Sequence, residues 1–238
     1  MGDFYERQLL LGSEHVDCFR RMRTSALFEL LQVVSIRHTE ELGMGREKTL
    51  DKGLLWVVAR MHAQIGRKPE YDERFTVRTW PGETMHVLFP RYYEILSEQG
   101  ETIVRASAVW SLMDAAARSA VFPEEHGISI PGEERGGELP WLVPVRPLDA
   151  VHRETFSVPY SYVDINGHLN NTRYFDLAED RISAASDGRL LREVTAEYNR
   201  EVKQGEPLLL EWGGDRDRYY VAGSTGKPCF RLLLRYEE

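Results

Sequence analysis

The order of apolar and polar positions predicts one amphipathic helix early in the chain. Residues 24–42 carry apolar side chains along one helical face, at Leu27, Leu30, Leu31 and Val34. Thr24 or Ser25 is suited to cap the start of this helix, and Gly43 is suited to end it. The spacing therefore predicts a helix that packs one side against a core.

Strand-like runs follow the helix and predict an antiparallel sheet. They fall at residues 54–65, 74–80, 86–96 and 102–113. Pro81-Gly82 closes the second run, and the turn residues 97–100 join the last two runs into a hairpin. One helix with a run of antiparallel strands is an α+β layout.

A change in amino-acid composition indicates a boundary between two units. Residues 123–150 are rich in proline and glycine and show no hydrophobic period. Because few contacts cross such segments, we interpret this stretch as a linker. The predicted units are then residues 1–122 and residues 151–238.

The second unit repeats the order of elements in the first. A strand at 156–163 and a helix at 171–185 precede strands near 194–202, 208–212, 219–222 and 230–235. Short matches align the two halves: Val16-Asp17 with Val163-Asp164, Phe28 with Phe175, and Arg67 with Arg200. The shared order and these matches predict an internal repeat of one α+β unit.

Composition and charge exclude several classes of protein. Of 238 residues, 42% are hydrophobic and 29% are charged, which is an ordinary globular balance. The net charge of −8 argues against a nucleic-acid partner. No apolar run approaches the roughly 18 residues that a membrane span needs, and the first residues lack the pattern of a signal peptide.

Cysteine usage favours a reducing compartment. Cys18 and Cys229 are too few for a disulfide framework, so we expect a cytoplasmic protein. No cysteine or histidine pair has the spacing of zinc ligands, and neither a metal nor a cofactor is expected. The sequence does not determine the oligomeric state, and a homodimer stays open.

The segment from Asp164 to Asn171 holds the strongest candidate chemistry. Asp164, Asn166 and His168 alternate, so an extended backbone would place all three on one face. The predicted helix begins directly afterwards, and its N-terminus could stabilise an oxyanion. The alternative is a plain turn, since Asn166-Gly167 is a strong turn signal by itself.

The motif Asp164-x-Asn166-x-His168-x-Asn170-Asn171 resembles the active-site motif of plant and bacterial acyl-acyl carrier protein thioesterases. Further segments are similar to the same family, at residues 55–60, 67–69, 79–81, 110–114 and 197–201. The resemblance implies two tandem hotdog folds, each a long helix wrapped by an antiparallel β-sheet. It also implies hydrolysis of fatty acyl thioesters carried by acyl carrier protein, without a cofactor.

Site residues follow from the same resemblance. The positions that match the family's catalytic residues are Asp164, Asn166, His168 and Glu201. Substrate-binding roles are expected for Asn170, Asn171 and Trp56, the last in an acyl tunnel. The residue after Glu201 is Val202, so the thiol found there in some plant members is absent.

The first unit lacks this constellation. Phe19 stands opposite Asn166, Arg21 opposite His168, and Lys68 opposite Glu201, while an aspartate is kept at Asp17. We therefore expect the first unit to shape an acyl pocket and the second to carry the active site. Because acyl carrier protein is acidic, it needs a local basic patch, for which Arg20, Arg21 and Arg23 are candidates.

Two questions stay open at this point. Glu201 could activate water through His168, or Asp164 could attack the thioester directly and form a mixed anhydride. Rival functions are an acyl-CoA thioesterase on the same fold and a sensor that binds acyl thioesters without turnover.

Overall fold

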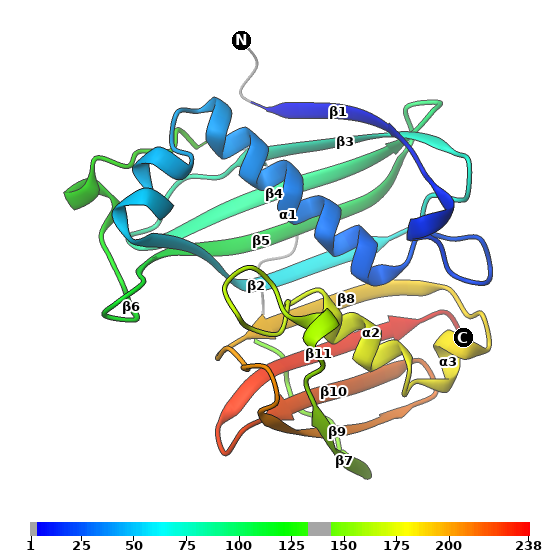
Figure 1. The fold of residues 1–238 in the computed structure, drawn as a ribbon. Coiled ribbons are helices and arrows are strands. Elements are labelled where there is room, and N and C mark those ends of the chain that lie inside the picture. Colours follow the sequence, from blue (N-terminus) through cyan, green and yellow to red (C-terminus); the bar gives the residue numbers. More distant parts are fainter. Residues whose placement is uncertain (1–3, 133–143) are drawn as a thin grey trace.

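One antiparallel sheet of eleven strands spans the molecule, and the α-helices lie on one of its faces (Figure 1). The computed structural model describes residues 4–132 and 144–238, and all counts refer to these residues. Part of the predicted linker, residues 133–143, lies outside the described residues. No helix within them is long and apolar enough to cross a membrane.

The first half of the chain forms one half of the sheet in the order β1-β3-β4-β5-β2. Its elements are β1 (Tyr5–Leu10), α1 (Thr24–Glu41), β2 (Leu54–Ile65), β3 (Arg74–Pro81), β4 (Leu88–Ser97), β5 (Thr102–Asp114) and β6 (Ser119–Ala120). The short β6 pairs only with β5. Helix α1 crosses this half of the sheet (Figure 1).

The second half continues the sheet in the order β8-β11-β10-β9-β7. Its elements are β7 (His152–Ser157), α2 (Arg173–Glu179), α3 (Ser183–Ser186), β8 (Leu191–Tyr198), β9 (Pro207–Asp215), β10 (Arg218–Ser224) and β11 (Pro228–Tyr236). Short 3-10 helices occupy Ser13–His15, Arg46–Lys48, Leu50–Lys52, Pro123–His126 and Tyr160–Tyr162.

Strands β2 and β8 join the two halves at the centre of the sheet. They pair antiparallel, with His62 opposite Thr195, and the His62 Nδ1 atom lies 2.9 Å from the Thr195 Oγ1 atom. The strand order on either side of this junction is the same when read outward, with β1 and β7 at the two edges. The structure thus confirms the predicted repeat and the α+β fold.

The core lies between the helices and the sheet. Helix α1 buries Leu27, Leu31 and Val34 of the predicted apolar face, whereas Leu30 is half-buried. It also buries Phe28. Phe28 stacks on Phe175 of α2 with ring centroids 4.1 Å apart, so the two halves share one core.

The second helix departs from the prediction. Instead of one helix over 171–185, α2 has seven residues and α3 has four. The Arg181 guanidinium donates to the Leu177 carbonyl oxygen at 2.7 Å, and Ile182 is extended. Because a side chain caps the carbonyl that a continuing helix would use, the helix stops there.

Two edge strands also differ from the prediction. No pattern predicted β1, and the strand expected at 156–163 is β7 at His152–Ser157, followed by the 3-10 turn Tyr160–Tyr162. Most of β1 and β7 is exposed. An edge strand without a clear buried face gives only a weak period-two signal.

Candidate active site

A tight turn, Asp164–His168, carries three of the predicted site residues. Gly167 donates its N–H to the Asp164 carbonyl oxygen at 3.0 Å, and Gly167 has a φ of 79° that suits glycine. The expectation that Asp164, Asn166 and His168 lie on one face of an extended strand is therefore wrong. The Asn-Gly pair bends the chain before a strand can form.

The Asp164 carboxylate holds this turn closed. Its Oδ1 atom accepts the backbone N–H of Asn166 at 2.8 Å and that of His168 at 3.3 Å. This is the local hydrogen bonding that aspartate offers to a turn. Asn166 is exposed, and within the described residues its side chain makes no hydrogen bond to the other predicted catalytic groups.

Backbone contacts bring Glu201 to this turn. Leu169 donates its N–H to the Val202 carbonyl oxygen at 2.7 Å, and His168 pairs with Lys203 in an isolated bridge. As a result, the His168 Nε2 atom lies 3.3 Å from the Glu201 Oε2 atom. The distant carboxylate and the imidazole therefore meet, as the family resemblance implies.

Arg118 joins the pair from the turn between β5 and β6. Its guanidinium forms an ion pair with the Glu201 carboxylate. The sequence assigned Arg118 no role, because the turn that carries it is remote from the motif in the chain. Arg118 has a positive φ of 56°, which is typical of a tight turn.

Burial lowers the pKa of the His168 imidazole. Desolvation is the largest cause, and the positive charges of Arg118 and Lys203 lower this pKa further. Asp164 and Glu206 act in the opposite direction. The net direction is downward, so His168 is neutral near pH 7 and can accept a proton.

Asn170 and Asn171 connect the turn to the helices. The Asn170 Oδ1 atom accepts the N–H and the hydroxyl of Thr172, each at 2.9 Å. The Asn171 Oδ1 atom accepts a hydrogen bond from the Gln32 Nε2 atom of α1 at 3.0 Å. Because the Asn170 side chain already accepts the backbone N–H of Thr172 at the start of α2, the N-terminus of this helix has fewer free N–H groups than the sequence predicts.

Trp56 lies apart from the other site residues. It is on β2, in edge-to-face contact with Phe89 at 4.7 Å, and it lines a cavity beneath α1. Of the predicted residues, the structure thus gathers Asp164, His168 and Glu201, places Asn170 and Asn171 beside them, and leaves Asn166 and Trp56 outside the cluster.

The equivalent turn in the first half has the same backbone. The Asp17 Oδ1 atom accepts the N–H of Phe19 at 2.8 Å and that of Arg21 at 2.9 Å. Arg20 takes the left-handed conformation in the place of Gly167. The turn is therefore a property of the repeated unit, and Asp17 is the counterpart of Asp164.

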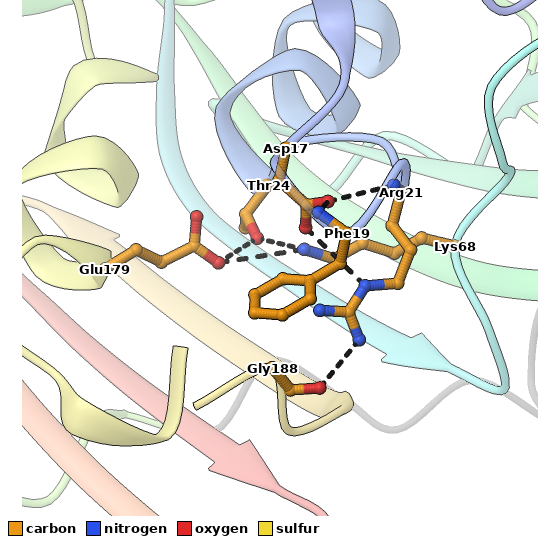
Figure 2. Close-up of polar contacts among 7 residues, drawn as sticks. All are labelled: Asp17, Phe19, Arg21, Thr24, Lys68, Glu179 and Gly188. Atoms are coloured by element: carbon orange, nitrogen blue, oxygen red, sulfur yellow. Dashed lines mark hydrogen bonds and ion pairs between the residues drawn. The ribbon is translucent and has the colours of Figure 1, made fainter. Parts of the chain in front are cut away.

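Figure 2 shows how the side chains of this counterpart site differ. Lys68, in the place of Glu201, donates to the Thr24 hydroxyl at 2.6 Å, and that hydroxyl donates to Glu179 at 2.5 Å. Arg21, in the place of His168, donates to the Gly188 carbonyl oxygen at 3.0 Å. These cations are engaged by groups of the second half, and no histidine–carboxylate pair is formed.

Two domain models of one protein family match most of the chain. A model of the acyl-ACP thioesterase N-terminal domain matches residues 2–125, and one of the C-terminal domain matches residues 145–222. An acyl-[acyl-carrier-protein] hydrolase of Cuphea viscosissima is 24% identical over 259 residues, covering 99% of this chain and 60% of that protein. A palmitoyl-acyl carrier protein thioesterase of Arabidopsis thaliana is 24% identical over 258 residues, covering 98% and 60%.

Solved structures give the same fold. The crystal structure of an acyl-ACP thioesterase from Bacteroides thetaiotaomicron aligns with a TM-score of 0.85 at 23% identity, over 99% of this chain and 98% of that one. The chain spans about 60% of the length of the two plant relatives. Because the two domain models together match most of its length, the chain belongs to the acyl-ACP thioesterase family.

Proposed function

We propose that the protein hydrolyses fatty acyl-acyl carrier protein thioesters to a free fatty acid and holo-carrier protein. The observation that carries this proposal is the approach of His168 to Glu201, at 3.3 Å, beside the turn held by Asp164. An imidazole with a lowered pKa next to a carboxylate is suited to general base catalysis. The plant relatives are named as acyl-ACP hydrolases and thioesterases.

In the proposed reaction, water attacks the thioester carbonyl carbon. Glu201, acting through His168, accepts one proton from that water as the new C–O bond forms. The C–S bond of the tetrahedral intermediate then breaks, and the protonated imidazole returns the proton to the thiolate of the carrier. Asp164 favours the charged imidazole through its own negative charge. Direct attack by Asp164 would use its Oδ2 atom, because its Oδ1 atom already accepts two backbone N–H groups.

The basic side chains around Glu201 suit an acidic carrier. Arg118 and Arg200 are exposed, as is Lys203. Arg118 pairs with Glu201, Arg200 precedes it in the chain, and Lys203 forms a bridge with His168. Of the basic group expected from the sequence, Arg20 and Arg23 are exposed, whereas Arg21 donates to the Gly188 carbonyl oxygen at the counterpart site. We therefore assign carrier docking to the surface at Arg118, Arg200 and Lys203.

We also propose that the protein works in the cytoplasm, the compartment expected from the sequence. Cys18 and Cys229 are free thiols in the structure, which is compatible with a reducing cytoplasm.

The test is turnover of His168→Ala and Glu201→Gln on an acyl carrier protein series of increasing chain length. We expect each variant to lose about 10²–10⁴-fold in kcat, the usual contribution of a general base. Acyl-CoA of the same chain length separates the rival enzyme, and release of free thiol separates a sensor from a hydrolase. Near wild-type turnover by both folded variants would refute the site assignment.

A further inference from the structure

Arg118 and His168 approach the same atom of Glu201. The Glu201 Oε2 atom lies 3.3 Å from the His168 Nε2 atom, and the Arg118 guanidinium forms its ion pair with that same oxygen. Arg118 belongs to the first half of the chain, whereas His168 and Glu201 belong to the second. One carboxylate oxygen is therefore shared between a cation of one half and the imidazole of the other.

This sharing weakens the proposed base. Glu201 assists His168 by favouring the imidazolium that forms when water gives up its proton, and a guanidinium on the same oxygen opposes that positive charge. Arg118 also lowers the pKa of His168 directly. The other charged groups that act on this pKa are Asp164, Glu206 and Lys203. Within the described residues, none of these three forms an ion pair with Glu201.

Only the side chain of Arg118 has to move to free Glu201. The backbone of its turn is fixed by Asp114, whose Oδ1 atom accepts the N–H groups of Ala116 and Ala117 at 2.8 and 2.7 Å. The side chains of Arg118 and Glu201 are 47% and 34% exposed. Because water screens ion pairs that are this exposed, the pair is weak and a competing anion can displace the carboxylate.

An acidic carrier brings such competing anions. Arg118 lies in the docking surface with two further exposed cations, Arg200 and Lys203. An acidic partner held by all three cations presents its carboxylates to Arg118 at a high effective concentration. A small neutral thioester brings no anion to this surface, so Glu201 stays paired with Arg118 when such a molecule binds.

We propose that Arg118 determines specificity for carrier-borne thioesters, because it occupies Glu201 in the free protein and releases it to His168 when an acidic carrier docks. This inference rests on the proposed function. The carrier then delivers the acyl group and also activates the site that hydrolyses it. A thioester without an acidic carrier meets a weaker base.

The first experiment compares two substrates with the same acyl group, one carried by acyl carrier protein and one by N-acetylcysteamine, a small neutral thiol. Arg118→Gln should raise kcat/KM for the small thioester by roughly three- to tenfold, since a more basic imidazole is a better general base. For the carrier-borne substrate it should raise KM by about threefold with little change in kcat, because docking loses one cation while Glu201 is free in either protein.

Two further variants separate this effect from a change in charge alone. Arg118→Lys keeps a cation beside Glu201 and should stay close to the wild-type protein with both substrates. Arg105→Gln removes the same charge from an exposed position near the start of β5 and should alter neither substrate.

Titration of the His168 ring by NMR gives a readout that needs no turnover. Adding carrier without an acyl group should raise the pKa of His168 in the wild-type protein. Arg118→Gln should show a raised pKa before carrier is added, and little further change afterwards. If both results hold while no acyl substrate is hydrolysed, the proposed function fails and the role of Arg118 stands.

The inference is overturned if folded Arg118→Gln leaves kcat/KM for the small thioester unchanged or lowers it. It is equally overturned if carrier leaves the pKa of His168 unchanged in the wild-type protein, or raises it as much in Arg118→Gln.

Discussion

Asp164 and Asp17 occupy equivalent positions, so each serves as a control for the other. Both accept the backbone N–H groups two and four residues ahead, but only Asp164 neighbours an imidazole. Replacing either by Asn should destabilise its turn by about 1 kcal/mol. Asp164→Asn should also lower kcat by roughly tenfold or more, since the charge that favours protonated His168 is lost. Steady-state kinetics and urea unfolding of both variants check this, and equal kcat values would contradict it.

His38 should make stability depend on pH. Its pKa is about 4 in the folded protein and 6.5 when unperturbed, because of burial and the neighbouring Arg91. Between these values the unfolded chain binds more protons, so stability rises with pH and is lost as pH falls from 6.5 towards 4. We expect a loss of about 3 kcal/mol over this window.

The measurement is the free energy of unfolding in urea at several pH values, for wild type and His38→Asn. Asn can still accept from Arg91 but does not titrate, so its curve should be flatter over this range. Parallel curves would show that another group controls the acid sensitivity.

Individual residues differ in how far the sequence could predict their place. His168 and Glu201 were paired only through the family resemblance, because a contact between a turn and a distant loop leaves no local pattern. The alternation predicts that Asn166 lies on one face with His168, yet the local Asn-Gly turn exposes Asn166. The Arg91 position carries no sequence signal, since an arginine in a strand is ordinarily exposed.

At the scale of elements, α1 contacts both the sheet and α2. Phe28 is fully buried and stacks on Phe175. Phe28→Ala should reduce the free energy of unfolding by about 3–5 kcal/mol, since it leaves a cavity and loses the ring contact. Val33→Ala on the exposed side of α1 should change it by less than about 0.5 kcal/mol. Denaturant unfolding of both variants checks this, and similar losses would contradict the assigned faces.

Elements with one buried face were predicted well. The bounds of β2 agree with the prediction, and β3, β4 and β5 differ from it by at most two residues at an end. The break between α2 and α3 could not be predicted from the apolar stripe, because it depends on the Arg181 side chain capping the Leu177 carbonyl oxygen. Such a contact competes with helix hydrogen bonds without altering hydrophobic spacing.

At the scale of the whole molecule, the counterpart site links the two halves. Lys68 belongs to the first half, and its ammonium nitrogen lies 3.7 Å from the Glu179 carboxylate of the second. Burial is the largest cause that lowers the pKa of Lys68. Glu179→Gln should therefore cost about 2 kcal/mol of stability, because it leaves a buried ammonium without its carboxylate.

Lys68→Met should cost less than Glu179→Gln, because its apolar side chain fits a buried position. Both proteins should keep wild-type kcat, since neither residue contacts the His168 cluster. Urea unfolding combined with turnover assays checks this, and a greater loss from Lys68→Met would refute the assigned role of the pair.

The continuous sheet was the feature hardest to predict from sequence. The repeat predicted two similar units, but the pairing of β2 with β8 joins residues more than half the chain apart. No local pattern encodes that contact, because each strand is apolar enough to pair with several others. The division into units at residues 122 and 151 stays a prediction.

The junction at His62 and Thr195 places two copies of the unit on one chain, and this affects how their sequences can diverge. In an assembly of two identical chains, every substitution appears twice, once in each site. Here the two copies lie on one chain, so Lys68 could replace a carboxylate on one side while Glu201 kept its own on the other. Covalent linkage thus allows one copy to lose its catalytic residues while it still contributes to stability and to substrate binding.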